Sequence, residues 1–449
     1  MLIDFKLSNF LSFNQTQIFS MEAGKVRNHS ERLYITKKLK LLKFMAIYGA
    51  NASGKSNLIS AMEFARSIII NGLSSNCANC YCKLSDSNRT LPSKFEFTIE
   101  LSERRFCYGF EVILNSLSFQ SEWLHELTYG NKYRLIYERN IVTGEHTVNT
   151  FFKDNSINER LAIYADDVKN DDSVLFLTLM NQNKGSLYND NEEIRIYQII
   201  FNWFKHKLSV NSPDSPITNY TYLLNDESIE KISKLLSTFS TGVSRFSLVS
   251  IPLEKVSSNV PKEIMKDISE HLIEHKKQLD EKGISTAPAI MLRNSYDNAM
   301  FILELCDDGS LNAKTFQFNH SNTNALFSLN EESDGTIRLL DLIEILLCTD
   351  QENVYVIDEI NRRFHPLLTY KFIEEYLKIA EDHHIQLIVT THESKIMDLD
   401  LLRKDEISFV NKNKQGESEV FSLNKFGERF DKKICTAYLN GDYGAIPIF

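Results

Sequence analysis

A glycine-rich stretch near the amino terminus constrains the fold of this chain most: Gly49-Ala50-Asn51-Ala52-Ser53-Gly54-Lys55-Ser56. It follows an apolar run at residues 41–48, which predicts a buried strand, and it precedes a helical pattern at residues 57–70. A glycine-rich turn between a strand and a helix is the context in which the pattern G-x-x-x-x-G-K-[ST] cradles a polyphosphate. The sequence therefore predicts a nucleotide-binding P-loop.

The residues of this loop have separate expected tasks. Gly49 and Gly54 let the backbone turn and approach a phosphate closely, and the amides at a helix amino terminus favour an anion. Lys55 is expected to reach the β and γ phosphates, and the Ser56 hydroxyl to bind Mg²⁺. The expected cofactors are therefore ATP and Mg²⁺. The residues expected to surround the phosphates are Asn51, Ala52, Ser53, Gly54, Lys55, Ser56 and Asn57.

Length and composition set the remaining bounds. A chain of 449 residues is long enough for two or three domains. No apolar run approaches the length of a membrane span, and Asp4, Lys6 and Asn9 interrupt any secretory signal at the amino terminus. We therefore expect a cytoplasmic protein with no membrane contact. The net charge of −10 argues against a positively charged surface for nucleic acid, although a local patch remains compatible with it.

Three cysteines, Cys77, Cys80 and Cys82, lie close together in the sequence. A closed zinc site needs four ligands, and no second cysteine pair or histidine pair follows nearby. We expect reduced structural thiols, with metal binding as the alternative.

The hydrophobic periodicity divides the chain into three predicted segments. Residues 1–155 predict a β-rich lobe built on the P-loop helix, because apolar and polar residues alternate along several runs. Residues 156–290 predict a compact helical insertion. Residues 291–449 return to alternating strands and helices, which imply a parallel sheet. The fold class is therefore α/β. The helices expected in the insertion span 173–181, 190–208, 227–239 and 261–279, and the strands expected after it include 289–293, 299–305, 313–318, 354–357 and 386–390.

A second motif ends one of these strands. Residues 354–357 are apolar and are followed by Asp358 and Glu359. Asp358 at the strand tip can hold Mg²⁺, and Glu359 can activate the water in line with the γ phosphate. The strand at 386–390 leads to His392, whose side chain can hydrogen-bond the γ phosphate or that water; the alternative for His392 is an ordinary polar residue at a strand end.

The segment Glu332-Ser333-Asp334-Gly335-Thr336 stands directly before a predicted helix. Ser333 or Asp334 can cap this helix, and Gly335 leaves room for a phosphate beside the amides. The segment is therefore either a second anion site or a helix cap alone.

Most of the chain separates Ser56 from Asp358, so that only a core split by a large insertion fits. The order of these motifs resembles that of the ABC-type head ATPases, which include the structural-maintenance, RecF and OLD proteins. More narrowly, both ends of the chain are similar to the small stand-alone AAA-type ATPases of bacterial phage-defence and abortive-infection operons. The motifs that carry the likeness are Asn9–Phe13, Glu332–Thr336, Asp358-Glu359, His365-Pro366, Thr391-His392 and Tyr443–Pro447.

The resemblance implies a composite site. Ser333 and Gly335 of one copy would close on the γ phosphate held by the P-loop of another copy, so that ATP binding drives the heads together and hydrolysis through Glu359 releases them. It further implies a homo-oligomer that senses infection or nucleic acid and controls a separately encoded effector, expected to be a nuclease, because too little chain follows His392 for a Toprim nuclease domain. The alternatives are a DNA-repair or DNA-end-binding ATPase, and nucleotide binding without turnover.

Overall fold

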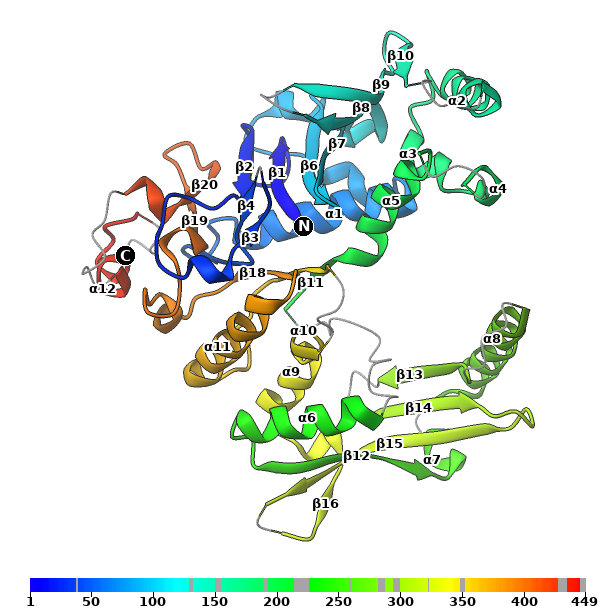
Figure 1. Ribbon diagram of the computed structural model, residues 1–449, viewed down its shortest axis with the longest axis vertical. Coiled ribbons are helices and arrows are strands. Elements are labelled where there is room, and N and C mark those ends of the chain that lie inside the picture. The colour runs from blue at the N-terminus through cyan, green and yellow to red at the C-terminus, as the bar shows by residue number, and fades with distance from the viewer. Residues whose placement is uncertain are drawn as a thin grey trace. The chain divides into compact units, whose positions relative to one another are not determined.

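The computed structural model of the chain consists of two compact units (Figure 1). The first comprises Met1–Asp214, Thr349–Arg362 and Ile373–Phe449, and the second comprises Ser215–Cys348 and Arg363–Phe372. The structure describes residues 1–37, 39–128, 132–149, 155–188, 193–213, 226–257, 260–281, 287–293, 299–321, 323–347, 352–426 and 434–444.

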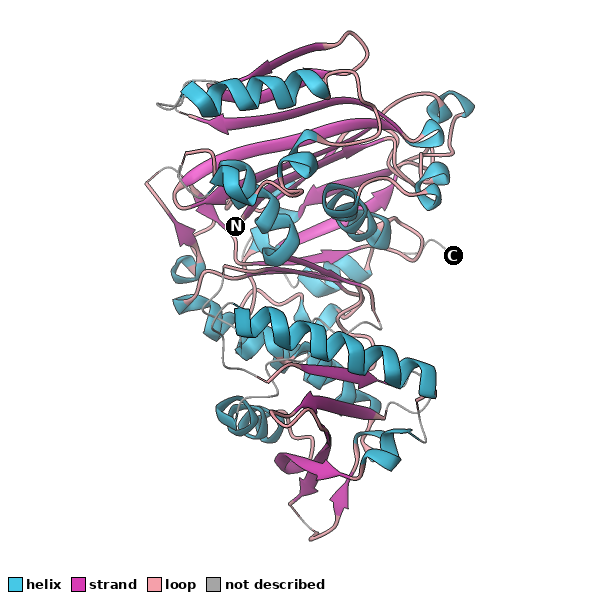
Figure 2. Ribbon diagram, turned by 90° about the vertical axis from the view of Figure 1, so that its right-hand side faces the viewer, coloured by secondary structure: helices cyan, strands magenta, loops and turns pink. Residues whose placement is uncertain are grey.

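An antiparallel sheet forms the β-rich part of the first unit (Figures 1 and 2). Its apolar residues alternate with polar ones, so that one face can be buried. In spatial order the strands are β10 (Glu145–Val148), β9 (Tyr133–Asn140), β8 (Ser118–Leu127), β7 (Arg104–Ile113), β6 (Ser93–Leu101), β1 (Leu2–Ser8) and β2 (Gln17–Ser20). The strands from β6 to β10 are neighbours in the order in which they follow one another along the chain, which suits antiparallel pairing, whereas β1 and β2 come from the amino terminus.

A mainly parallel sheet forms the other layer of the first unit. The P-loop strand β5 lies between β18 and β19, and every residue of β5, β17 and β18 is buried. Continuous burial explains why these strands are uninterrupted apolar runs. In spatial order the strands are β11 (Leu208–Asn211), β17 (Val354–Ile357), β18 (Gln386–Thr390), β5 (Phe44–Tyr48), β19 (Ile407–Lys412) and β20 (Ser418–Ser422); only β20 runs antiparallel to its neighbour.

The helix that follows the P-loop, α1 (Lys55–Asn71), joins the two layers. Its buried residues recur at helical spacing and belong to one hydrophobic core with residues of both sheets. Gly72 ends the helix with φ +83°, a conformation that glycine adopts without strain. A short pair of strands, β3 (Tyr34–Ile35) and β4 (Lys40–Leu41), completes the strands of this unit that the structure describes.

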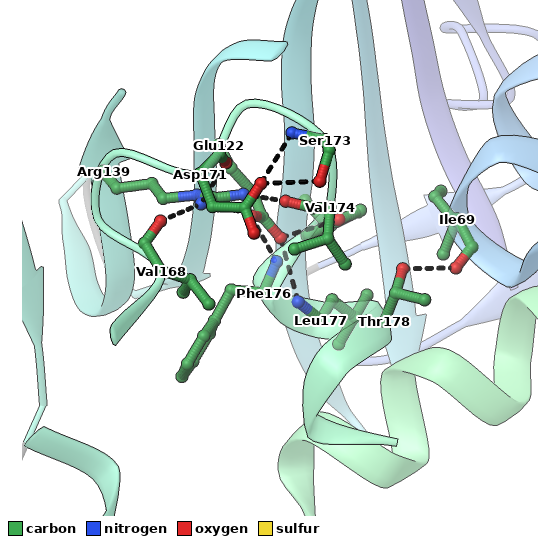
Figure 3. A network of polar contacts seen from close by, with 11 residues as sticks. Ile69, Glu122, Arg139, Val168, Asp171, Ser173, Val174, Phe176, Leu177 and Thr178 are labelled. Atoms are coloured by element: carbon green, nitrogen blue, oxygen red, sulfur yellow. Dashed lines mark hydrogen bonds and ion pairs between the residues drawn. The ribbon is translucent and has the colours of Figure 1, made fainter. Parts of the chain in front are cut away.

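A buried ion pair fixes the segment that follows the antiparallel sheet (Figure 3). The side chains of Glu122 on β8 and Arg139 on β9 are fully buried and lie 3.1 Å apart. Glu122 accepts hydrogen bonds from the amides of Phe176 and Leu177, at 2.7 and 3.0 Å. Thr178 then donates to the carbonyl of Ile69 at 2.6 Å. The helix α3 (Phe176–Met180) is therefore tied both to the sheet and to the end of α1.

Residues 156–208 of the first unit, which were predicted to be helical, are helical in part. The helix predicted at 173–181 is α3. The one predicted at 190–208 is shorter, because Leu208 already belongs to β11, which pairs with β17. The helices are α2 (Asn155–Asp167), α4 (Gly185–Tyr188), α5 (Ile196–Asn202) with a π turn at Trp203–Lys207, α11 (Pro366–Asp382), whose first turns belong to the second unit, and α12 (Ile434–Leu439).

An antiparallel sheet forms the second unit, which contains β12 (Val243–Ile251), β13 (Ala289–Arg293), β14 (Met300–Leu305), β15 (Leu311–His320) and β16 (Leu326–Phe327). The helix α6 (Asp226–Thr238) contacts β12, and α8 (Lys262–Glu281) contacts β13 and β14, where Ile268 and Leu272 join one hydrophobic cluster. The other helices of this unit are α7 (Leu253–Ser257), α9 (Asp334–Leu342) and α10 (Glu344–Leu347).

Two expectations about this part of the chain need correction. The strands predicted at residues 289–318 exist, but they are antiparallel and lie outside the parallel sheet. The turn between β14 and β15 is far too short for the crossover that parallel strands require. The helices α6 and α8 confirm two predicted helices, yet β12 lies between them, so the segment is not purely helical. The two compact units do not coincide with the three predicted segments, because the first unit contains residues from all three of them. The predicted segment boundaries at 155 and 290 therefore stay a prediction.

No helix among the residues that the structure describes is both long and apolar enough to cross a lipid bilayer.

Candidate functional site

The P-loop connects β5 to α1 through a turn that requires glycine at two positions. Gly54 caps α1 with φ +112°, and a Cβ atom there would collide with the hydroxyl of Ser418. A Cβ atom on Gly49 would collide with the carbonyl of Val410. Val410 and Ser418 belong to the hairpin β19–β20, so the P-loop packs closely against this hairpin at both glycines. The first amides of α1 are left without helical partners and face an incoming anion.

Lys55 is buried at the beginning of α1, at 6% exposure. Its ammonium group donates to the carbonyls of Gly49 and Ala50, at 2.8 and 3.0 Å. Burial lowers the pKa of Lys55, and the negative charges of Asp358 and Glu359 oppose this shift. The two carboxylates are therefore close enough to act on the lysine. A buried cation held by neutral carbonyls is well placed to exchange them for phosphate oxygens, with which it makes stronger hydrogen bonds.

Asp358 and Glu359 stand where β17 ends. Asp358 is buried at 7% exposure, and its carboxylate accepts a hydrogen bond of 2.5 Å from the hydroxyl of Thr390. The same hydroxyl accepts from the amide of Glu359 at 2.7 Å. Glu359 has φ +50°, which a residue with a side chain rarely adopts. Thr390, at the end of the neighbouring strand β18, thus holds both acidic residues in position.

His392 lies two residues after the end of β18. Its partial burial lowers the pKa of the imidazole, and the positive charge of Lys55 lowers it further, whereas Glu359 and Asp358 raise it. Its backbone amide donates to the side-chain oxygen of Asn361 at 3.3 Å, and the hydroxyl of Thr391 donates to the same oxygen at 3.0 Å. Asn361, which follows β17 and the two acidic residues, is therefore hydrogen-bonded to the segment that contains His392.

One cavity of about 370 Å³ collects most of the predicted site residues. It lies within the first unit, and its lining consists of Asn51, Ala52, Ser53, Gly54, Lys55, Ser56, Asn57, Glu359, His392 and Lys412. The structure thus brings the P-loop together with residues from the far end of the chain, as the sequence predicted. Asp358 is not among the lining residues, but it precedes Glu359, which is, and both are hydrogen-bonded to the hydroxyl of Thr390.

The predicted anion segment belongs to the second unit. Ser333 caps α9 and accepts a hydrogen bond of 3.2 Å from the amide of Thr336. Ser333 and Gly335 line another cavity, of about 670 Å³, together with Thr336, Arg363, His365 and Lys371. A Cβ atom on Gly335 would lie 3.3 Å from the carbonyl of Arg363, so the glycine also permits close packing.

Sequence reasoning missed three residues around the first cavity. Thr390 and Asn361 organise the acidic residues and His392 through hydrogen bonds, and Lys412 adds a cation to the lining. The signal for Thr390 was its place at the end of the strand next to Asp358. No local pattern marks Lys412, which reaches the cavity from the other end of the chain. Of the terminal motif at residues 443–447, positions 445–447 lie outside the described residues.

The cysteines Cys77, Cys80 and Cys82 are free thiols. Burial raises the pKa values of Cys80 and Cys82. Within the described ranges, no three histidine, cysteine, aspartate or glutamate side chains gather as metal ligands would.

The α/β fold and the P-loop beside an acidic strand end are those of a P-loop ATPase. The chain belongs to the family described as "AAA domain, putative AbiEii toxin, Type IV TA system", whose model matches residues 44–398. Comparison with curated proteins returns no match.

Three solved structures show similarity at low identity. The SmcHead bound to the C-winged helix domain of ScpA is 15% identical, with a TM-score of 0.40 over 94% of this chain and 98% of that one. The Smc head domain bound to the C-terminal domain of ScpA from Pyrococcus furiosus is 15% identical, with a TM-score of 0.36 over 94% and 97%. The SMC head domain from Thermotoga maritima is 12% identical, with a TM-score of 0.35 over 94% and 98%.

Proposed function

We propose that this protein is a Mg²⁺-dependent ATPase of the bacterial cytoplasm that controls a separately encoded effector in defence against phage. The observation that carries the ATPase part is the meeting of Lys55, Glu359 and His392 in one cavity, although they stand far apart in the sequence. Such a set serves phosphoryl transfer, where catalysis rests on positioning and on stabilising charge.

The oxygen donors beside the P-loop fit a magnesium ion. Ser56 offers a hydroxyl and Asp358 a buried carboxylate, and Mg²⁺ prefers such hard oxygen ligands. A bound Mg²⁺ would neutralise charge on the phosphates. Glu359 would hold and deprotonate the attacking water, and His392 would hydrogen-bond the γ phosphate. Thr390 would keep Asp358 and Glu359 aimed at these tasks through its two hydrogen bonds.

We propose that two copies pair when ATP binds. The cavity of the second unit contains a helix amino terminus with Ser333 and Gly335, and it is lined by Arg363 and Lys371. These groups favour an anion. In a pair, Ser333 and Gly335 of one copy would contact the γ phosphate held by Lys55 of the other. Hydrolysis would remove this shared anion and let the copies separate.

The defence role is supported by the family, whose description names a putative toxin of a toxin–antitoxin system. The effector would be a nuclease that the paired copies hold inactive or release. A nucleic acid could serve as the trigger. The competing proposal is an ATPase that acts on DNA itself, and the net charge of −10 argues against it.

The test combines Glu359→Gln with a measurement of native mass. We expect the variant to bind ATP and stay paired, while hydrolysis falls by roughly 100- to 10,000-fold, because the general base is lost. The matched control is Glu393→Gln, which removes a carboxylate next to His392 but outside the cavity lining. Unchanged hydrolysis in Glu359→Gln would contradict the ATPase mechanism, and a monomer with bound ATP would contradict the pairing.

The same preparations distinguish the defence role from direct action on DNA. We expect hydrolysis to be indifferent to added DNA and the product of a neighbouring gene to copurify. A steep, salt-sensitive stimulation by DNA would favour the repair ATPase instead, because contacts to the phosphate backbone weaken as salt rises.

A further inference from the structure

A second hollow adjoins the P-loop cavity in the first unit. It measures about 340 Å³, within the usual range of small-molecule sites. Six of the residues that line it are Leu11, Ser12, Asn57, Tyr81, Leu84 and Lys412. Asn57 and Lys412 also line the P-loop cavity, so the two hollows meet at these residues.

The position of this hollow relative to the P-loop indicates which part of a nucleotide it can hold. Lys55 and Ser56 serve the β and γ phosphates and the metal, while the backbone of the loop cradles the α and β phosphates. Asn57 comes next along α1, on the side of the hollow. The nucleoside of a bound nucleotide is attached to the α phosphate and extends away from the γ phosphate. The second hollow is therefore where the nucleoside is expected to lie.

The lining of the hollow suits a flat, partly apolar ring. Leu11 and Tyr81 are partly exposed while they pack on the hydrophobic core, and Leu84 is 50% exposed. A base stacked on the Tyr81 ring would cover these apolar surfaces. Asn57 and Ser12 offer polar groups on the side that faces the P-loop, as the sugar and the polar edge of a base require.

The wall that contains Tyr81 is held rigidly. The amide of Leu11 donates to the carbonyl of Cys80 at 2.8 Å, and the amide of Cys82 donates to the side chain of Asn9 at 3.1 Å. Asn88, buried at 5% exposure, donates to the carbonyl of Cys82 at 2.9 Å. A segment fixed on both sides of Tyr81 presents its ring without a large loss of entropy on binding.

The floor of the hollow is tied to the P-loop itself. Ser12 accepts a hydrogen bond of 2.7 Å from the side chain of Asn57, and its hydroxyl lies at hydrogen-bonding distance, 2.7 Å, from that of Ser418. Ser418 is shared between the two regions, since its hydroxyl also donates to the carbonyl of Ser53 in the P-loop, at 2.6 Å. The hollow and the phosphate site therefore keep one fixed spacing, as a single ligand that occupies both would need.

We propose that this hollow binds the nucleobase of the nucleotide whose phosphates occupy the P-loop, and that Tyr81 and Leu84 determine which base is accepted. This inference deepens the proposed function and rests on it. It gives the cysteine-rich segment at residues 77–84 a role: the chain there supports the ring of Tyr81, and its buried thiols are packing groups.

The test compares the affinities of ATP, GTP and inorganic triphosphate, measured by calorimetry on the full chain. We expect Tyr81→Ala to weaken ATP binding by roughly 5- to 100-fold, as the loss of base–aromatic stacking does elsewhere, and Tyr81→Phe to retain it. The affinity for inorganic triphosphate, which has no base, should not change. The ratio of the dissociation constants of ATP and GTP should move closer to one in Tyr81→Ala and in Leu84→Ala.

Leu91→Ala is the matched control for Leu84→Ala. Both leucines are 50% exposed and lie on the same connecting segment, but Leu91 is not part of the lining. Equal affinities for ATP in wild type, Tyr81→Ala and Leu84→Ala, or an equal loss for ATP and triphosphate, would overturn the base site and leave the proposed ATPase intact. If neither ATP nor triphosphate binds wild type, the proposed function fails, and this inference fails with it.

Discussion

The two cavities that contain the predicted phosphate-binding residues differ in the charges that line them. The P-loop cavity combines Lys55 with Glu359, and Asp358 directly precedes Glu359. The cavity around Ser333 is lined by Arg363 and Lys371, and Asp334, which stands between the lining residues Ser333 and Gly335, lies 3.9 Å from the guanidinium of Arg363. The first therefore combines cationic and acidic groups, as the proposed binding of phosphate, metal and water requires, whereas the second combines cations with a helix amino terminus, as the proposed anion site requires. This difference is what the proposed pairing would use, with the P-loop cavity of one copy facing the Ser333 cavity of another.

The largest effect should follow from breaking the first cavity. We expect Lys55→Ala to weaken ATP binding by roughly 10- to 150-fold, because charge-assisted hydrogen bonds to phosphate are lost. Calorimetry with ATP measures this change. Lys414→Ala removes an exposed lysine that lies outside the cavity and should leave the affinity unchanged. If Lys55→Ala binds ATP as the wild type does, the P-loop is not the phosphate site.

An intermediate effect should follow from altering the second cavity. We expect Ser333→Ala to lower ATP-driven pairing and hydrolysis by roughly fivefold to tenfold, through the loss of one hydrogen bond to the shared phosphate. ATP binding to a single copy should be unaffected. Native mass and steady-state hydrolysis, measured side by side, separate these effects.

Ser328→Ala controls for the loss of a helix cap. Ser328 caps the short helix just before Ser333 with a similar hydroxyl, but it does not line the cavity. Both substitutions should lower the free energy of unfolding by roughly 0.5–2 kcal/mol. Pairing that weakens equally in both variants would assign Ser333 to folding alone.

The smallest effect concerns the acid side of the pH profile. Burial and Lys55 lower the pKa of His392, so that the imidazole stays neutral further below its ordinary value of 6.5. The imidazole of His392 would then be protonated only at a pH below this value. We therefore expect the loss of hydrolysis that depends on His392 only below about pH 6.5. Steady-state rates between about pH 5.5 and 8.5 measure this limb.

His206 offers the control for this profile. Burial also lowers its pKa, but it lies outside the cavity lining. His392→Gln should remove the acid limb of the pH profile, whereas His206→Gln should leave the profile unchanged. An acid limb that persists in His392→Gln would mean that another group titrates there.

Local patterns were sufficient to predict many elements of the fold. The apolar run before Asp358 predicted β17 with its observed bounds, and the pattern after the P-loop predicted α1 to within two residues at each end. The pattern was insufficient for Leu208–Asn211, a strand too short to separate from the helix before it. It also placed β13 to β15 in the wrong sheet, because short apolar strands look alike whichever neighbour they pair with.

The candidate site likewise contains residues that local patterns predict and residues that they do not. Glycine spacing, a lysine and paired acids are local chemical requirements, so the sequence by itself marks Gly49, Gly54, Lys55, Asp358 and Glu359 as candidates. Asn361 and Lys412 could not, since their contribution depends on the contacts that the fold brings about.

The sequence alone determined the phosphate-binding loop, the acidic strand end and the α/β class, because backbone conformation and side-chain chemistry at those positions are local properties. Only the tertiary structure decided that β11 and β17 to β20 assemble around β5, that Thr390 holds both acidic residues, and that Tyr81 stands beside Asn57. Such contacts arise when distant segments bury their apolar faces together, and no short stretch of sequence contains that information.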